Sequence, residues 1–305
     1  MLSIIIPTCN RPNDLGTLLT LIASQDMPIN EVIVIDSSDQ KTRVESNFGA
    51  DVRFEHIQVT IKSAAIQRNL GMDLVSDKCD FMCFLDDDVL PDSSYISRLV
   101  SGLIQSQGIG ISGLALNPKK VNSIRREPVG FFGLAQRLLF LDSKRDGVLL
   151  KSGVNIPIRN YSGEITKVEW LIGCALWDFK KVSKIRFESD FLGQSLNEDV
   201  IFSIRAAEHG NLFVNPRIHL SHTESIIGRP INEDFWKMWV LNRRRLVRIS
   251  YQGKPNFLYY HIANFGQFIS LVYTGFRNMD FKNRAPLGII LAYKALIQKG
   301  KINEN

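Results

Sequence analysis

Three short apolar segments constrain the fold of this chain more than any other feature. They occupy residues 2–6, 32–35 and 81–85, and each is rich in apolar side chains throughout instead of alternating with polar ones. Strands that are apolar on both faces are typical of a parallel sheet covered by helices on each side. Helical spacing of apolar residues over 15–22 and a second helical segment over 64–75 separate the strands. The sequence therefore predicts an α/β fold with a doubly wound, mostly parallel sheet.

Each of these apolar segments ends in residues that can bind a charged ligand. Thr8 and Arg11 follow the first, Asp36 follows the second, and the three consecutive aspartates of residues 86–88 follow the third. In open α/β sheets, ligands bind beyond the carboxyl ends of the strands, so we expect these side chains to face one crevice. Three adjacent carboxylates repel one another, and a divalent cation offsets that repulsion. The triplet predicts a metal site, with a solvated acidic turn as the alternative.

The composition is that of a globular protein. The chain has 305 residues, of which 45% are hydrophobic, and shows no repeat or low-complexity segment. Its four cysteines have no zinc-like spacing, which favours a reducing compartment. The first apolar segment begins directly at the N-terminus without a leader pattern, so we predict a cytoplasmic location.

The charge of the chain is unevenly distributed. Residues 231–305 hold 12 Lys and Arg against 4 Asp and Glu, whereas residues 1–230 hold 25 against 27. This asymmetry predicts a basic, helical extension that meets an anionic partner. Interleaved aromatic residues favour a membrane surface over nucleic acid, with peripheral attachment at the inner face of the cytoplasmic membrane. The alternative is that these helices pack on the core or on a second subunit of a homo-oligomer.

Five motifs together resemble family 2 glycosyltransferases of the GT-A fold. In chain order they occupy residues 3–8, 34–38, 67–71, 84–88 and 197–200. The resemblance covers about residues 1–225, and several ordered motifs are more specific than any one alone. More loosely, the chain resembles the bacterial branch that builds surface polysaccharides. The resemblance implies a nucleotide-sugar transferase domain over residues 1–230, followed by the helical extension over 231–305.

The resemblance also implies an activity. The expected reaction is an inverting transfer of a sugar from a nucleotide-diphosphate donor to an acceptor hydroxyl of a glycan or lipid-linked glycan precursor. The residues implied in donor-nucleotide binding are Pro7, Thr8, Arg11, Asp36, Arg68, Asn69, Asp86, Asp87 and Arg229. Asp36 is expected to accept a hydrogen bond from the base edge, with a cap on the following segment as its alternative role. Arg229 is expected to close over the diphosphate.

A divalent metal, Mg²⁺ or Mn²⁺, is implied by the same resemblance. The spacing of Asp86 and Asp88 matches the DxD element of the family, in which carboxylates meet the ion and substrate phosphates complete its shell. His222 matches the later His of the family, because strand alternation from Pro216 places it at a strand end. His219 is the alternative ligand.

A general base is implied at the start of a later helix. Asp199 matches the base of the family, and Glu198 is expected to support it or to bind the acceptor. The alternative for this pair is simple enrichment of acids in the first turn of a helix. Acceptor binding is implied for Trp170, Gly173 and Cys174, although the basic residues often found after this glycine are missing here.

Two other function classes fit part of the sequence. Residues 85–89 also match the strand-end pattern of haloacid-dehalogenase-like phosphatases, in which the first aspartate is a nucleophile. That fold, however, normally places its aspartates on an early strand, and here two ligand-like strand ends precede them. The second alternative is a catalytically inactive, membrane-associated protein that binds a nucleotide sugar.

Overall fold

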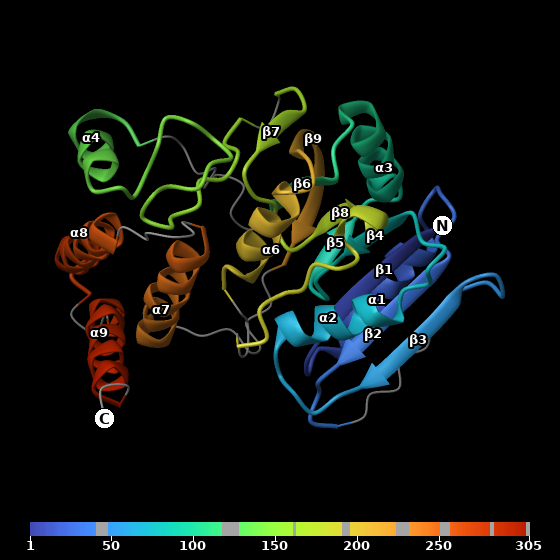
Figure 1. The fold of residues 1–305 in the computed structure, drawn as a ribbon, viewed down its shortest axis with the longest axis horizontal. Coiled ribbons are helices and arrows are strands. Elements are labelled where there is room, and N and C mark those ends of the chain that lie inside the picture. Colours follow the sequence, from blue (N-terminus) through green and yellow to red (C-terminus); the bar gives the residue numbers. More distant parts are fainter. Residues whose placement is uncertain are drawn as a thin grey trace. The chain divides into compact units, whose positions relative to one another are not determined.

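The computed structural model describes residues 1–40, 48–117, 128–160, 163–190, 196–223, 232–250, 257–280 and 284–302. The chain forms two compact units, and Figure 1 labels their elements. The first unit comprises Met1–Arg126 and Pro157–Gly228, and the second comprises Glu127–Ile156 and Arg229–Asn305. The sequence placed a boundary near residue 230 and assigned all earlier residues to one domain. In the structure, residues 127–156 belong instead with the C-terminal helices.

The first unit is built on a nine-stranded sheet within its described residues. The strand order is β3-β2-β1-β4-β8-β6-β9-β5, and β7 pairs with β9. The strands are β1 (Leu2–Thr8), β2 (Glu31–Asp36), β3 (Arg53–Gln58), β4 (Phe81–Phe84), β5 (Val89–Pro91), β6 (Gly110–Leu116), β7 (Thr166–Val168), β8 (Ala175–Asp178) and β9 (Leu212–His222). Six of these share one direction, and β5, β7 and β8 run against them. The predicted mostly parallel sheet is therefore confirmed.

The first two long helices lie on opposite faces of this sheet. Helix α1 (Pro12–Ala23) leads from β1 to β2, and α2 (Ala64–Leu74) leads from β3 back past β1 to β4. The connection from β1 to β2 and the connection from β3 to β4 run in opposite directions across the sheet. Because such crossovers are right-handed, the two helices lie on different faces. The side chains of β1 agree, since Ile4 and Ile6 share a core cluster with the buried leucines of α1, whereas Ile5 packs on α2. Strand β1 thus lies at the switch point of the sheet, where ligands bind.

Two local features fix these helices. Pro12 takes the first helical position of α1, where its missing N–H costs nothing. In α2, the Ser63 hydroxyl accepts a hydrogen bond from the Ile66 N–H and caps the helix. A Cβ at Gly71 would lie 2.4 Å from Ile5, so only glycine lets α2 approach the sheet this closely. The other helices of the unit are α3 (Tyr95–Ser106), α5 (Phe179–Val182) and α6 (Glu198–Ala207).

The described part of the C-terminal segment is mostly helical, as predicted for the extension, and α4 is the helix that residues 127–156 add to the second unit. Its helices are α4 (Gly130–Leu138), α7 (Asn232–Ser250), α8 (Phe257–Arg277) and α9 (Ala285–Ile302). A buried arginine, Arg243, connects α7 to the segment after α4: its guanidinium lies 3.7 Å from the Trp239 ring centroid and donates to the Ser152 carbonyl at 3.0 Å. None of the described helices combines the length and the apolar character that crossing a bilayer requires.

Candidate functional site

The carboxyl ends of β1 and β2 lie side by side at the centre of the site. Thr8 is the register partner of Asp36, and Pro7 pairs with Ile35 inside the sheet. The buried side-chain amide of Gln67 on α2 donates to the carbonyls of Thr8, at 2.8 Å, and of Ile35, at 2.6 Å. Gln67 belongs to the motif at residues 67–71. Nothing in the sequence indicated that its side chain holds two strands together instead of binding a ligand.

Asp87 is the anchor of the aspartate triplet. Its carboxylate accepts hydrogen bonds from the Thr8 hydroxyl and from the Arg11 guanidinium, both at 2.7 Å. Burial raises the pKa of Asp87 to about 6, against the opposing effects of Arg11 and Thr8. Arg11 also lies 3.5 Å from a carboxylate oxygen of Asp88. Three of the residues expected to bind the nucleotide therefore hold one another, and they fix the backbone between Asp86 and Asp88.

The two outer aspartates of the triplet meet a histidine from β9. Asp86, Asp88 and His222 each offer one ligand atom, and these atoms all lie within 4.8 Å of one another. Antiparallel pairing sets Val89 of β5 opposite His222, which brings the imidazole Nε2 to 3.0 Å from Asp88. His219, the alternative ligand, pairs with Leu114 in the interior of the sheet.

This donor set fits a small divalent cation. Two carboxylates and one imidazole supply three ligands, and Mg²⁺ or Mn²⁺ takes its remaining oxygen ligands from phosphates and water. Asp88 is buried, and burying a carboxylate is costly unless a cationic group such as Arg11, at 3.5 Å, or a metal ion lies nearby. Within the described ranges, Asp86, Asp88 and His222 are the one group of three potential metal ligands that lie this close together.

Arg68 connects the triplet to the start of α6. Its buried guanidinium donates to Asp86 at 2.6 Å and forms an ion pair with Glu198. A Cβ at Gly173 would lie 3.0 Å from the Arg68 Nη2, so the absence of a side chain there leaves room for this arginine. Arg68 Nε and Glu198 Oε2 are buried and have no hydrogen-bond partner among the described residues. The sequence placed Arg68 near the nucleotide or the aspartates, but it gave no indication of the Glu198 pair.

Asp199 lies next to this pair, in the first turn of α6. Burial raises the pKa of Asp199 to about 6, and the negative charge of Asp86 acts in the same direction while Arg68 opposes it. The backbone N–H of Val200 donates to one carboxylate oxygen at 2.8 Å. A carboxyl group that titrates near neutral pH is suited to accept a proton from a hydroxyl.

Asp36 is engaged on both of its carboxylate oxygens. One accepts the Ser38 N–H at 2.8 Å, which is the turn contact named as its alternative role. The other lies 3.0 Å from Nε2 of His56, a β3 residue that sequence reasoning missed. A carboxylate oxygen has a second acceptor site, so these contacts orient Asp36 without excluding a base edge.

Two of the three residues expected at the acceptor are buried. Trp170 is buried in the core. Cys174 is also buried, its Sγ accepts the Asp86 N–H at 3.4 Å, and burial raises the pKa of its thiol. Gly173 lines the Arg68 contact described above. Arg229, which was expected to close over the diphosphate, lies outside the described residues.

Asn69, expected at the nucleotide, instead joins α2 to the segment before α6. Its amide donates to the Phe187 carbonyl at 2.9 Å and accepts the Phe187 N–H at 2.8 Å. Both the N–H and the carbonyl of the Asn69 side chain are thereby paired with the backbone of Phe187. The contact supports the fold around Arg68, which lies 5.5 Å from the Phe187 ring centroid.

Replacing Asn69 by alanine should reduce stability rather than nucleotide binding. Two part-buried backbone groups of Phe187 would lose their partner, at a cost of about 1–3 kcal/mol in the free energy of unfolding. Urea denaturation measures this cost. Asn13→Ala on the exposed side of α1 is the matched control, with an expected change below about 0.5 kcal/mol. If Asn69→Ala lost nucleotide binding while its free energy of unfolding stayed unchanged, Asn69 would be a nucleotide-binding residue and this prediction would be wrong.

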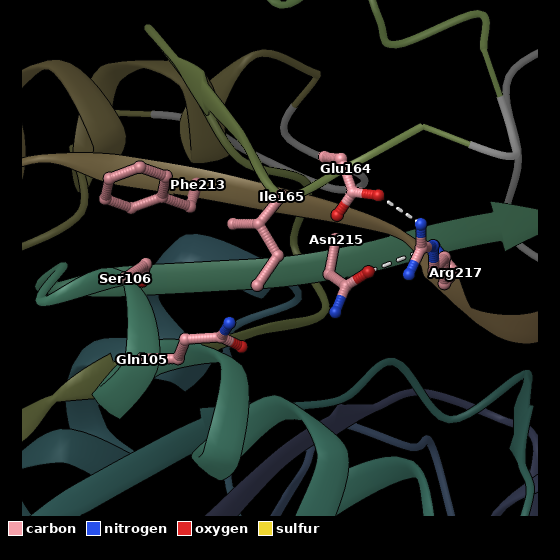
Figure 2. A pocket seen from close by; sticks show the side chains of 7 residues that line it. All are labelled: Gln105, Ser106, Glu164, Ile165, Phe213, Asn215 and Arg217. Carbon is pink, nitrogen blue, oxygen red and sulfur yellow. Dashed lines mark hydrogen bonds and ion pairs between the residues drawn. The ribbon is translucent and has the colours of Figure 1, made fainter.

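A separate cavity lies along the middle of β9. Figure 2 shows its lining side chains, with the Glu164–Arg217 ion pair at one end. The cavity has a volume of about 380 Å³ and is lined by Gln105, Ser106, Glu164, Ile165, Phe213, Asn215 and Arg217. None of these is a predicted site residue, and the ion pair is largely exposed, so the cavity forms no part of the site at the strand ends.

Three comparisons relate the chain to known proteins. A family model described as glycosyl transferase family 2 matches residues 3–145. No curated protein sequence matches the chain closely enough to count as a relative. Among solved structures, the chain is similar to S. aureus TarS at 15% identity and a TM-score of 0.51, covering 92% of this chain and 44% of that one.

Two shorter TarS structures carry nucleotides. TarS 1–349 in complex with UDP-GlcNAc matches at 14% identity and a TM-score of 0.57, covering 97% of this chain and 80% of that one. TarS 1–349 in complex with UDP matches at 13% identity and a TM-score of 0.52, covering 90% and 72%. At these identities the likeness shows a shared fold. The chain spans less than half of the first TarS structure named above.

Proposed function

We propose that the chain is a glycosyltransferase that transfers a sugar from a nucleotide diphosphate to an acceptor hydroxyl with inversion, and the match of residues 3–145 to the glycosyl transferase family 2 model supports the reaction class. One observation carries the finer part of this proposal. The ligand atoms of Asp86, Asp88 and His222 lie together, and Arg68 connects Asp86 to the first turn of α6, where Asp199 lies. The residues that would hold a cation for the diphosphate are thus connected through Arg68 to the helix turn that carries the proposed base, Asp199.

In the proposed reaction, the protein residues have separate tasks. Asp36, held by Ser38 and His56, is poised to accept a hydrogen bond from a donor base. Asp199 takes the proton of the acceptor hydroxyl as that oxygen attacks the anomeric carbon, and the nucleotide diphosphate leaves from the opposite face. Arg68 holds Asp86 and Glu198 in place while this proton moves.

A divalent cation would be held by Asp86, Asp88 and His222. When bound, such an ion stabilises the negative charge that develops on the departing diphosphate. Asp87 is not one of the three residues whose ligand atoms lie together, and its two oxygens accept hydrogen bonds from Thr8 and Arg11. Their contacts set the spacing of the two flanking carboxylates.

The acceptor in this proposal is a glycan or lipid-linked glycan precursor. The family match and the TarS-like fold favour glycosyl transfer over the phosphatase alternative. Because TarS 1–349 is solved with UDP and with UDP-GlcNAc, uridine nucleotides are the first donors to test.

A panel of UDP-, GDP- and dTDP-sugars tests the function directly. With Mn²⁺ present, one nucleotide should raise the melting temperature by about 5–10 °C at a hundredfold excess over its Kd. The matching sugar nucleotide should slowly release its diphosphate even without an acceptor. Stabilisation without any turnover would support the inactive binding protein instead. Hydrolysis of p-nitrophenyl phosphate without nucleotide preference would support the phosphatase.

A further inference from the structure

The second unit exposes an apolar stripe along α8. Leu258, Phe265, Ile269 and Phe276 recur at intervals of seven, four and seven residues, which places them on one face of the helix. All four are exposed, with Phe265 at 63% and Phe276 at 68%. Other residues of α8 are buried against the rest of the unit: Tyr260 packs with α7 and α9, and Ala263 packs on the segment after α4.

Helix α4 extends this apolar surface. Phe131 is 87% exposed and Leu138 is 67% exposed. Leu139, the next residue, packs on Gly266, where a Cβ would lie only 2.9 Å from the leucine. The exposed Leu138 and Phe265 directly precede these two contacting residues in the sequence. We call the six exposed residues Phe131, Leu138, Leu258, Phe265, Ile269 and Phe276 the apolar face.

Basic residues lie at both ends of α8. The Lys151 ammonium lies 5.4 Å from the Tyr259 ring and the Arg244 guanidinium lies 5.0 Å from the Phe257 ring, both at the N-terminal end of α8, while Arg277 follows directly after Phe276. The second unit as a whole holds 17 Lys and Arg against 7 Asp and Glu, a net charge of +10, whereas the first unit has a net charge of −4. Apolar side chains flanked by cations match the boundary between acyl chains and anionic headgroups.

We infer that the apolar face of α4 and α8 docks on an anionic lipid bilayer, with its aromatic and aliphatic side chains in the headgroup region. Two copies of this unit, each with a charge of +10, would repel each other if the same face joined them. An anionic membrane instead compensates the charge and buries the apolar side chains at once. Docking of this kind goes beyond sugar transfer and does not depend on the identity of the donor.

Vesicle co-sedimentation of the full chain tests the inference. We expect binding to vesicles of phosphatidylcholine with phosphatidylglycerol, and little binding to phosphatidylcholine alone. Phe265→Ser combined with Phe276→Ser should weaken partitioning by more than about tenfold, since each phenylalanine contributes apolar burial. Ile104→Ser is the matched control, because Ile104 is an equally exposed apolar residue, at 63%, on α3 of the first unit.

The outcomes are distinct. Loss of partitioning in the double variant, with binding retained by Ile104→Ser and an unchanged melting temperature for both, supports the inference. Equal binding by the double variant and the parent chain overturns it. Light scattering that shows a dimer, dissociated by the same double substitution, would also overturn it by assigning the face to self-association. Donor hydrolysis by the chain in solution is measured separately, so failure of the docking test leaves the proposed reaction untouched.

Discussion

Asp199→Asn should leave donor binding intact and reduce sugar transfer by at least about 10³-fold. The amide has nearly the same shape as the carboxyl group but cannot take the proton of an acceptor hydroxyl. Steady-state transfer rates measure the loss, and calorimetric titration with the donor nucleotide measures what is retained. Glu208→Gln is the matched control, because it makes the same acid-to-amide change at the exposed end of α6. Near-normal turnover of Asp199→Asn would remove this residue from the role of base.

The rate of transfer should also depend on pH in a defined direction. Burial raises the pKa of Asp199 to about 6, so the carboxylate that accepts the proton is lost as the pH falls through that value. Transfer should therefore decline about tenfold per pH unit below pH 6 and level off above pH 7. A rate that stays constant between pH 5 and pH 7 would contradict the assignment.

The second large effect is expected at the metal ligands. Asp88→Asn should weaken ion-dependent nucleotide binding by more than about 100-fold. This is more than the loss typical of substituting a residue that only hydrogen-bonds to a metal ligand. Its carboxylate is buried beside His222 and Asp86, so no solvent-exposed group replaces the lost charge. Calorimetry with UDP in the presence and absence of Mn²⁺ measures the change.

Asp92→Asn controls for a loss of negative charge nearby. Asp92 lies four residues further along the chain, is exposed, and pairs with Arg98 on the surface. Its substitution should leave nucleotide binding unchanged, since surface ion pairs contribute little. If Asp88→Asn binds the nucleotide as tightly as the parent chain with Mn²⁺ present, the Asp86, Asp88 and His222 cluster does not hold the ion.

Much of the fold was readable from local pattern. The apolar segments predicted at 2–6, 32–35 and 81–85 became β1, β2 and β4, because side chains that are apolar on both faces are stable only inside a covered sheet. The helix expected over 64–75 is α2. The crossing of β8 between β4 and β6, antiparallel to both, had no such signal, since strand order depends on long-range pairing.

The candidate site divides in the same way. The acidic strand end and the family resemblance together selected Asp86, Asp88 and His222, and the structure brings their ligand atoms within 4.8 Å of one another. Spacing could not tell which polar side chains face a ligand and which face the protein. Asn69, Cys174 and Asp87 each have the right residue type and position in a motif, yet each is engaged by the surrounding chain.

The class of sheet, the helical C-terminal region and the acidic strand ends follow from the amino-acid order, since periodicity and residue type are local properties of the chain. The pairing of Arg68 with Glu198 and the association of residues 127–156 with the C-terminal helices emerge only in the folded structure. The folded structure also decides which apolar residues of α8 remain uncovered. These outcomes depend on which distant groups compete for the same buried space or hydrogen bond, and that competition is resolved only when the whole chain is folded.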